Sequence, residues 1–440
     1  MSPELMVALL FASLMALLLL GFPVAFTLGG LSIAFGYFAF GAEFFNLLPM
    51  RVFGTMTNYV LIAVPLFVFM GTMLEKSGIA ERLLDTMSLM LGRLRGGLAL
   101  SVIIVGALLG ATTGVVGATV TTMGLITLPT MLKRGFSKTL STGTIAAAGT
   151  LGQLVPPSVV MVLLASVMNV SVGDMFAAAL APSAILVLAY LIYVYAVALF
   201  KPEHAPPIET EELADFWRAG ALARIVRAFV LPGLLVIAVL GSIYAGIATP
   251  TEAAAVGAFA ATLLTAFERK LTWEVLVDVC KQTTFLTSMV FIILVGATAF
   301  GLVFRGIGGD DVLTRLIERA NLSPQLFLAF ALVGIFIAGA FIDFIEIIFI
   351  FVPVIAPLMA KYDLNLIWVG MLITVCLQTS FLTPPFGFTL FYLKGVSPPE
   401  IATSDIYKGV APFIALQLLV VALLLFFPEL AFLVPTSARR

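Results

Sequence analysis

The sequence predicts an all-α polytopic membrane protein with an inverted-topology repeat, two re-entrant helical hairpins and two broken helices. Three observations support this fold class. The 440-residue chain is 61% hydrophobic and only 11% charged, whereas soluble proteins average about 25% charged residues. Apolar runs long enough to cross a bilayer recur from end to end. Two of these runs are too long for one crossing, and they match each other along the chain.

The apolar runs that suit single crossings share a length near that of one membrane span. They are 4–21, 24–45, 55–75, 176–200, 229–248, 251–268, 283–304 and 409–434. The first run has no basic leader and no cleavage site of small residues, so we expect a retained helix rather than a signal peptide.

The two longer runs predict hairpins. The run 96–132 is uncharged, and as one straight helix it would measure roughly 55 Å, against about 30 Å of hydrocarbon. The run 326–360 carries only Asp343 and Glu346, both near its centre. Each run has a polar or glycine-rich middle, so we expect it to enter the membrane and return to its own side. Such tips persist at depth only when they are buried in protein or line a cavity.

The distribution of charged residues predicts from which side of the membrane each hairpin opens. The first hairpin is flanked by basic residues, namely Arg82, Arg93, Arg95, Lys133, Arg134 and Lys138. By the positive-inside rule this hairpin opens from the cytoplasm. Counting one crossing per span then puts the second hairpin and the amino terminus on the opposite, outer side.

A shift of 228 residues along the chain, here called the repeat shift, aligns each hairpin and the broken span that follows it without a gap. It brings Pro129 onto Pro357 and Lys133 onto Lys361, and it pairs Pro156-Pro157 with Pro384-Pro385. The paired segments "GQLVPPSVV" and "SFLTPPFGF" predict two interrupted spans. Because the repeats start from opposite sides, the pattern is that of an inverted repeat, which is typical of secondary transporters.

The hairpin tips and interrupted spans predict a cation site and an anion site. Proline and glycine free backbone carbonyls, which are hard oxygen ligands suited to Na⁺, and helix N-termini attract a carboxylate. The cation candidates are Thr112, Thr113, Gly114, Thr119, Gly149, Thr150, Gly152, Asp343, Glu346, Gln378, Thr379 and Ser380. The substrate candidates are Thr113, Pro156, Pro157, Ser158, Asp343, Thr383, Pro384 and Pro385.

Simpler interpretations of these residues stay open. Glycine and threonine also allow close packing of membrane helices. Asp343 and Glu346 are intramembrane carboxylates and suit a cation site or a proton carrier, but a carboxylate at a tip also caps a helix N-terminus or reaches water. Glu252 follows Pro250 and suits a capping role equally well. The amphipathic segment 208–227 lies on the membrane surface or braces the fold.

Several function classes lack their residues in this sequence. The lone His204 lies in a polar loop, and Cys280 and Cys376 are isolated, so the sequence predicts no transition-metal site and no cofactor. No phosphate-binding loop is present, which leaves an ion gradient, or ATP hydrolysed by a partner, as the energy source. The sequence has no basic patch, so it gives no indication of nucleic-acid binding.

At these segments the sequence resembles the large membrane subunit of tripartite ATP-independent periplasmic (TRAP) transporters, the DctM-like family. The segments are "GIATPTEAAA" (246–255), "LPTMLKRGF" (128–136), "GTLGQLVPPSVVM" (149–161) and "PPFGFTLFYLKG" (384–395). The resemblance implies a sodium-coupled importer in the bacterial inner membrane. It also implies a small four-helix partner subunit, a periplasmic binding protein that delivers an organic acid, and an elevator-like motion of the ion-transporter-superfamily kind.

The tips depart from the family pattern. At the first tip, dicarboxylate-type members have a sequence similar to "SGSSPAT", whereas this chain has "TGVVGAT" (113–119). In the second broken span this chain has Gln378 where those members have a glutamate. The segment "DFIEIIFIFVPVIAPL" (343–358) is similar to a branch associated with 2-oxo acids, lactate or related monocarboxylates.

The expected division of the chain alternates scaffold and transport parts. Residues 1–95 and 171–323 form the scaffold, 96–170 and 324–395 carry the hairpins and broken spans, and 396–440 form a carboxy-terminal helix. A stand-alone organic-anion carrier of the divalent-anion symporter type, coupled to Na⁺ or H⁺, is the main alternative. A membrane-embedded enzyme would have only Asp343 and Glu346 for catalysis, and a channel would not need two antisymmetric broken spans.

Overall fold

Helices dominate this fold because a chain inside hydrocarbon must satisfy its own backbone hydrogen bonds. The computed structural model describes residues 2–113, 116–208, 210–218, 220–385 and 387–434, apart from the side chains of 112, 113 and 210–212. All regular elements within these ranges are helical. Seven of these helices are long and apolar enough to cross a membrane, or up to nine if each of two bent pairs is one span. The predicted all-α membrane fold is confirmed.

The amino-terminal part contains two helices more than the hydropathy pattern predicts. Its helices are α1 (Pro3–Leu19), α2 (Val24–Phe40), α3 (Phe44–Met56), α4 (Ala63–Lys76) and α5 (Ile79–Met90). The sequence predicted spans at 24–45 and 55–75. The helix α3 fills the interval between them and overlaps their ends, and α5 follows the second span. Gly41 ends α2 in a backbone conformation with φ of +65°, and the chain turns there before α3.

The first predicted hairpin and interrupted span have the following elements. They are α6 (Gly97–Thr113), α7 (Val116–Lys133), α8 (Lys138–Thr150), the 3₁₀ turn η3 (Leu151–Gln153) and α9 (Val159–Met168). The second set is α16 (Pro324–Gly339), α17 (Phe344–Ile350), α18 (Val352–Lys361), α19 (Leu366–Leu382) and α20 (Phe388–Val396). In this set α17 and α18 meet at a bend of 49°.

The remaining helices connect and surround the two sets. They are α10 (Val172–Phe200), α11 (Thr210–Arg218), α12 (Ala221–Tyr244), α13 (Pro250–Phe267), α14 (Trp273–Gly306), α15 (Gly309–Arg319) and α21 (Thr403–Phe426). The span predicted at 283–304 begins earlier, because Thr272 caps the start of α14. The span predicted at 409–434 is shifted: α21 ends at Phe426 and a 3₁₀ turn starts at Pro428.

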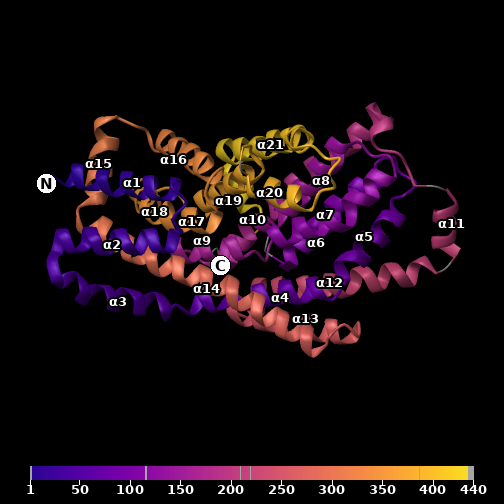
Figure 1. Ribbon diagram of the computed structural model, residues 1–440, viewed down its shortest axis with the longest axis horizontal. Helices are drawn as coiled ribbons and strands as arrows, with labels where there is room; N and C mark the ends of the chain where they lie inside the picture. Colours follow the sequence, from indigo (N-terminus) through magenta and orange to yellow (C-terminus); the bar gives the residue numbers. More distant parts are fainter. Residues whose placement is uncertain (1, 114–115, 209, 219, 386, 435–440) are drawn as a thin grey trace.

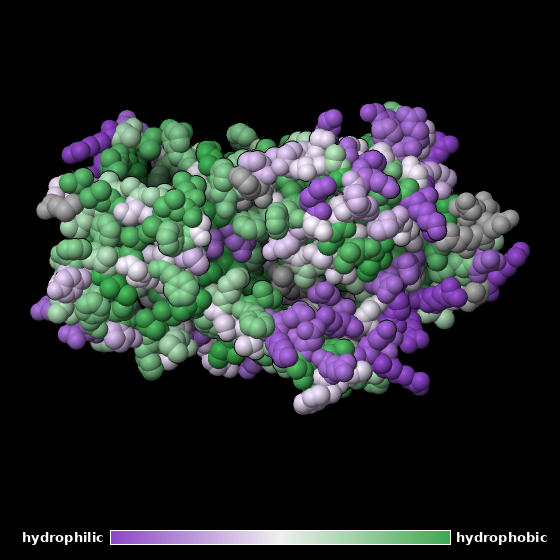
Figure 2. Space-filling view, viewed as in Figure 1, coloured by the Kyte–Doolittle hydropathy of each residue, from purple (hydrophilic) through white to green (hydrophobic). Residues whose placement is uncertain are grey.

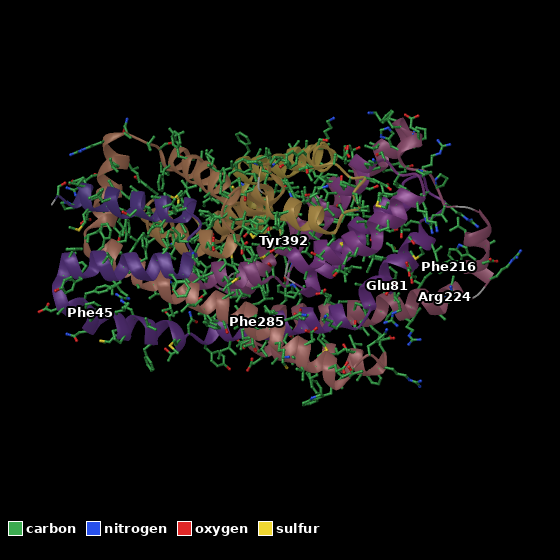
Figure 3. All side chains as sticks on the ribbon, viewed as in Figure 1. Phe45, Glu81, Phe216, Arg224, Phe285 and Tyr392 are labelled. Carbon is green, nitrogen blue, oxygen red and sulfur yellow. The ribbon has the colours of Figure 1, made fainter. Side chains whose placement is uncertain are left out.

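The amphipathic segment predicted at 208–227 is divided between two helices. Gly220, in a left-handed conformation, separates α11 from α12. Phe216 is buried, and the guanidinium of Arg224 lies 6.0 Å from the centre of its ring (Figure 3). Leu213 is buried too, and it lies directly beside Gly92. Of the two roles left open for this segment, the contacts of α11 support bracing of the fold.

Helix bounds repeat at the spacing found in the sequence. The repeat shift carries Val116, the start of α7, onto Phe344, the start of α17, and Lys138 onto Leu366 at the starts of α8 and α19. Pro156-Pro157 and Pro384-Pro385 are both cis peptide bonds. In Figure 1 the hairpin α6–α7 lies to the right and α16–α18 to the left, so the hairpins open toward opposite ends of the molecule. This arrangement is the inverted repeat.

Ion pairs define these two ends. Glu4 pairs with Arg315 at 3.3 Å, which places the amino terminus beside α15 and the opening of the second hairpin. At the other end Glu268 pairs with Arg82 and with Arg227. We call these the Glu4 end and the Glu268 end. Figure 2 shows hydrophilic residues gathered on the right of the molecule, where Figure 1 places α5, α11 and α12.

Candidate functional site

The two hairpins meet scaffold helices around a cavity of about 490 Å³, here called the tip cavity. The start of α7 contributes Val116, Gly117 and Ala118, and the start of α17 contributes Asp343, Phe344 and Ile345. The broken spans contribute Val159, Phe381, Phe388 and Tyr392. The wall opposite consists of α4 and α14, with Val68, Glu75, Gln282, Phe285, Leu286, Met289 and Val290. Phe285 and Tyr392 lie near the middle of the molecule in Figure 3.

The carboxylates of the second hairpin cap α17. Asp343 is the N-cap residue, and its Oδ1 accepts a hydrogen bond from the backbone N–H of Phe344 at 2.8 Å. Glu346 Oε2 accepts one from the backbone N–H of Asp343 at 3.3 Å. This is the reciprocal capping box, in which two otherwise unpaired helix donors are satisfied. Asp343 also lines the tip cavity, so capping leaves it in reach of a ligand.

The first hairpin tip is described only in part. Gly114 lies outside the described residues, as do the side chains of Thr112 and Thr113. Thr119 is buried near the start of α7. Gly117 lies against the ring of Tyr392, where a β-carbon would come within 2.9 Å of the ring. The glycine therefore allows the hairpin to approach the second broken span closely.

The glycines of the first broken span serve close packing. A β-carbon on Gly149 would lie 2.2 Å from Val120, and one on Gly152 would lie 2.9 Å from the Cα of Gly110. The hairpin and the break in the span behind it thus touch backbone to backbone, as small residues permit in membrane proteins.

The polar side chains of the broken spans form a buried layer behind the tip cavity. Gln378 Nε2 donates to Thr150 Oγ1 at 3.4 Å, and these two residues are equivalent in the repeat. The hydroxyls of Thr150, Thr379 and Ser380 donate to backbone carbonyls of the preceding turn, at 2.7–2.8 Å. Each hydroxyl oxygen still has lone pairs available to a cation.

The prolines mark the breaks themselves. Ser158 Oγ donates to the Gln153 carbonyl at 2.7 Å, and Thr383 Oγ1 donates to the Thr379 carbonyl at 2.9 Å. The Pro385 carbonyl accepts from Tyr407 Oη at 2.8 Å. Pro156, Pro157, Ser158, Thr383, Pro384 and Pro385 do not line the tip cavity. Among the described candidates only Asp343 does.

Sequence reasoning missed several polar residues of this region. Glu75 Oε1 accepts a hydrogen bond from Thr122 Oγ1 at 3.0 Å, which joins α4 to α7 across the tip cavity. Gln153 is fully buried, and neither of its amide atoms has a partner within the described part of the chain; the same holds for Gln378 Oε1. A glutamine next to a double proline in an apolar run was the available signal for Gln153.

Comparison with solved structures identifies the fold. The fold matches that of the YdaH transporter of Alcanivorax borkumensis with a TM-score of 0.65, over 98% of both chains, at 14% sequence identity. At this identity the match concerns the fold alone.

Comparison of sequences identifies the family. Residues 11–430 match the family described as the tripartite ATP-independent periplasmic transporter, DctM component. The C4-dicarboxylate TRAP transporter large permease protein DctM of Pseudomonas aeruginosa is 30% identical over 92% of this chain and 93% of its own length. The ectoine TRAP transporter large permease protein TeaC of Halomonas elongata is 30% identical over 99% of this chain and 100% of its own. The chain belongs to the DctM family, and the resemblance found in its motifs is confirmed.

Proposed function

We propose that this chain is the large permease subunit of a sodium-coupled TRAP transporter that imports an organic acid. The observation that carries the proposal is the tip cavity, where hairpins from opposite ends of the molecule meet beside two broken spans. A site at the centre of an inverted repeat is suited to alternating access. The family's relatives are permease subunits rather than enzymes, which agrees with a transport role.

The tip cavity favours a small acid with an apolar part. Phe285, Met289, Phe344, Phe381 and Phe388 provide apolar walls, as is usual for small-molecule sites. The names of the relatives include C4-dicarboxylates, ectoine and sialic acid, so the family alone does not select the acid. The resemblance of residues 343–358 to the monocarboxylate branch supports a 2-oxo acid or a lactate-like acid as cargo.

Sodium is the proposed coupling ion. Buried oxygen atoms without hydrogen-bond partners among the described residues, namely those of Gln153 and Gln378, fit a hard cation such as Na⁺. Thr150, Thr379 and Ser380 of the broken spans are buried as well, and so is Thr119 of the first hairpin. With Asp343 and backbone carbonyls at the two breaks, these residues are the proposed ligands.

The proposed motion is of the elevator type. The parts 96–170 and 324–395 would move together against the scaffold 1–95 and 171–323. Several hydrogen bonds join these parts in the present state. They include Thr122 to Glu75, Asn58 Nδ2 to Ser166 Oγ at 3.0 Å, and Ser183 Oγ to the Leu154 carbonyl at 2.9 Å. Bonds between parts that slide past each other would have to break during the movement.

The proposed partners are a small four-helix membrane subunit and a periplasmic binding protein. This chain covers 65% of the isethionate TRAP transporter permease protein DctMQ of Oleidesulfovibrio alaskensis. That relative therefore has additional sequence beyond the matched part, which supports a second membrane component. The proposed location is the bacterial inner membrane, with the Glu4 end in the periplasm and the basic cluster around Glu268 in the cytoplasm.

The test is uptake into proteoliposomes that contain this chain and its small subunit. Labelled pyruvate is supplied with and without an inward Na⁺ gradient, and with and without the binding protein. We expect uptake only when both are present. Na⁺-driven uptake without the binding protein would instead favour the stand-alone carrier. If pyruvate is not taken up, C4-dicarboxylates, ectoine and sialic acid are tested, and failure with all of them contradicts the proposed function.

A further inference from the structure

A second cavity, of about 510 Å³, lies on the side of α14 toward the Glu4 end. Its wall includes Arg51, Thr55 and Asn58 from α3 and the residues after it, and Thr298 and Arg305 from α14. The first broken span adds Ser166 and Asn169, and the second hairpin adds Phe349 and Pro353. Scaffold and hairpin parts thus enclose this space together, and we call it the arginine cavity.

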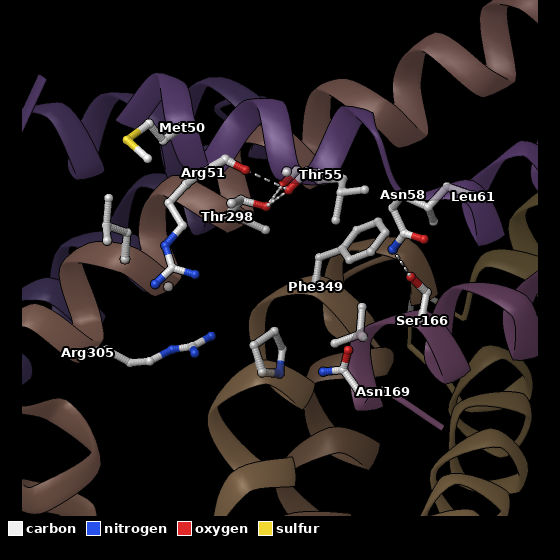
Figure 4. A pocket seen from close by; sticks show the side chains of 17 residues that line it. Met50, Arg51, Thr55, Asn58, Leu61, Ser166, Asn169, Thr298, Arg305 and Phe349 are labelled. Atoms are coloured by element: carbon white, nitrogen blue, oxygen red, sulfur yellow. Dashed lines mark hydrogen bonds between the residues drawn. The ribbon is translucent and has the colours of Figure 1, made fainter. Parts of the chain in front are cut away.

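The charged groups of the arginine cavity are two guanidinium groups that face a common space. Figure 4 shows the guanidinium groups of Arg51 and Arg305 pointing into it from two different helices. Thr55 and Thr298 hydrogen-bond to each other at 3.1 Å, and Asn58 donates to Ser166. No aspartate or glutamate is among the described lining residues, and neither arginine forms an ion pair within the described part of the chain.

The arginine cavity is the repeat counterpart of the tip cavity. The repeat shift carries Asn58 onto Leu286 and Leu61 onto Met289, and it carries Thr121 onto Phe349. In each pair one residue lines the arginine cavity and the other lines the tip cavity. One long helix, α14, serves both: residues 282–290 face the tip cavity and residues 294–305 face the arginine cavity.

The charges of the two cavities break this symmetry. Arg51 and Arg305 correspond to Val279 and Ser77, so the cations occur on one side only. The tip cavity instead contains the carboxylates of Glu75 and Asp343. An anion is therefore attracted at the Glu4 end and meets carboxylates at the other cavity. Guanidinium groups suit this task because they stay charged and bind carboxylates in a bidentate manner.

We propose that the arginine cavity is the capture site for the transported carboxylate, which Arg51 and Arg305 hold before it reaches the tip cavity. This inference rests on the proposed function. It adds a binding site whose two arginines lie outside the hairpins and the broken spans. Clefts lined by charge of one sign concentrate counter-ions and raise association rates by about 10–10³-fold. A free guanidinium pair would serve entry of an anion and not its release.

The main test is the concentration dependence of Na⁺-driven uptake in the full complex with its binding protein. The variants are Arg51→Gln, Arg305→Gln and the double variant, with Arg51→Lys and Arg305→Lys to retain charge. Arg319→Gln is the control, because Arg319 is exposed at the same end on α15 and does not line the cavity. We expect the double variant to raise KM at least about tenfold with kcat little changed, the lysine variants to recover part of the loss, and the control to match wild type.

A second measurement keeps the inference testable if a variant assembles poorly. Thr298→Cys is introduced into a Cys280→Ser, Cys376→Ala background, and its rates of reaction with an anionic and a cationic methanethiosulfonate are compared. We expect the ratio of anionic to cationic rates to fall about tenfold when Arg51 and Arg305 are both glutamine, and labelling to slow when pyruvate is present. Lipid phosphates present the same anionic chemistry, so the experiment is repeated in purely zwitterionic and in anionic bilayers.

The outcomes separate the two proposals. Wild-type uptake with unchanged KM in the double variant, or an unchanged labelling ratio, would overturn the capture site and leave the permease assignment intact. Protection by anionic lipid but not by the transported acid would also overturn it. Absence of uptake in the wild-type complex for every acid tested would contradict the proposed function instead.

Discussion

At the scale of single residues, Asp343 combines a structural and a candidate transport role. As N-cap of α17 it satisfies a helix donor, and it also faces the tip cavity. An N-cap needs a side-chain acceptor but not a charge, since asparagine caps a helix about as well as aspartate. The two roles can therefore be separated by substitution.

We predict that Asp343→Asn keeps the thermal stability of the wild type but lowers uptake at least tenfold. Asp343→Ala should lose about 1 kcal/mol in addition, because the cap is removed. Thermal unfolding in detergent and proteoliposome uptake are measured together. As a control for capping alone, Thr249→Ala removes the cap of α13, whose capping box joins Thr249 and Glu252 away from the tip cavity. Uptake by Asp343→Asn at the wild-type rate would show that the carboxylate only caps.

Glu268 is a second residue with a defined electrostatic role. Burial raises the pKa of its carboxyl, but the hydrogen bonds and charges of Arg82 and Arg227 outweigh burial and hold the pKa below its ordinary value of 4.5. A depressed pKa means that the ionised form is stabilised by folding. The contribution is full above the ordinary pKa and is lost as the pH falls through the lower pKa of the folded state.

We predict that Glu268→Gln lowers stability at pH 7 by about 1 kcal/mol, since exposed arginines contribute only modestly. The difference from wild type should shrink as the pH falls below about 4.5, where Glu268 of the unfolded chain takes up a proton, and should vanish below the lower pKa of the folded state. Unfolding midpoints between pH 7 and pH 3.5 are the measurement. A difference that stays constant over this range would contradict the assigned ion pairs.

At the scale of elements, contact between the first hairpin and the break behind it depends on Gly110 and Gly152. A β-carbon on Gly110 would come within 2.6 Å of Gly152. Backbone atoms occupy that space and cannot rotate away. Gly29, by contrast, lies in the helix α2 with nothing within 4 Å of such a β-carbon.

We predict that Gly110→Ala destabilises the protein by about 1–3 kcal/mol, as is usual for overpacking. Gly29→Ala should be neutral or stabilising by up to about 1 kcal/mol, because alanine favours helix. Both are compared by thermal unfolding. Equal behaviour of the two variants would mean that α6 and η3 do not pack as described.

At the scale of the whole molecule, the inverted repeat and its two cavities suit a moving transport part. The hydrogen bond from Asn58 to Ser166 joins the proposed scaffold to the proposed transport part. Thr265 donates to the Met73 carbonyl at 3.3 Å within the scaffold alone. A covalent cross-link between residues 58 and 166 would therefore block an elevator motion. A cross-link between residues 73 and 265 would not.

We predict that oxidising the pair Asn58→Cys and Ser166→Cys abolishes uptake and that reduction restores it. The matched control is Met73→Cys with Thr265→Cys, both pairs being made in a Cys280→Ser background. Cross-linking is followed by gel shift and transport by uptake. Full transport by the cross-linked first pair would exclude relative motion of these two parts.

The membrane orientation is tested on intact cells. We predict that Ser2→Cys is labelled by a membrane-impermeant maleimide, because Ser2 lies at the Glu4 end beside α15. A cysteine at Arg269, next to the Glu268 cluster, should be labelled only after permeabilisation. Labelling of Arg269→Cys in intact cells would reverse the assigned sides.

The candidate site shows which features of the fold can be predicted from local sequence and which cannot. The repeat shift predicted both hairpins and both breaks, because length, charge and proline placement are properties of the chain alone. The helix α3 was missed, since a short helix between apolar spans has no distinct hydropathy signal. Glu75 and Tyr392 were also missed, since only folding brings α4 and the second broken span next to the tips. Gln153 was missed although it stands beside the double proline in an apolar run.

The sequence by itself determined the membrane environment, the number and kind of hairpins, the inverted repeat and the family, because these depend on composition, periodicity and motifs along the chain. Tertiary structure decided which polar groups face a common space. It placed Asp343 both on a helix N-terminus and at a cavity, and it brought Arg51 and Arg305 together from helices far apart in sequence. Such juxtapositions depend on long-range packing, which no local pattern of residues specifies.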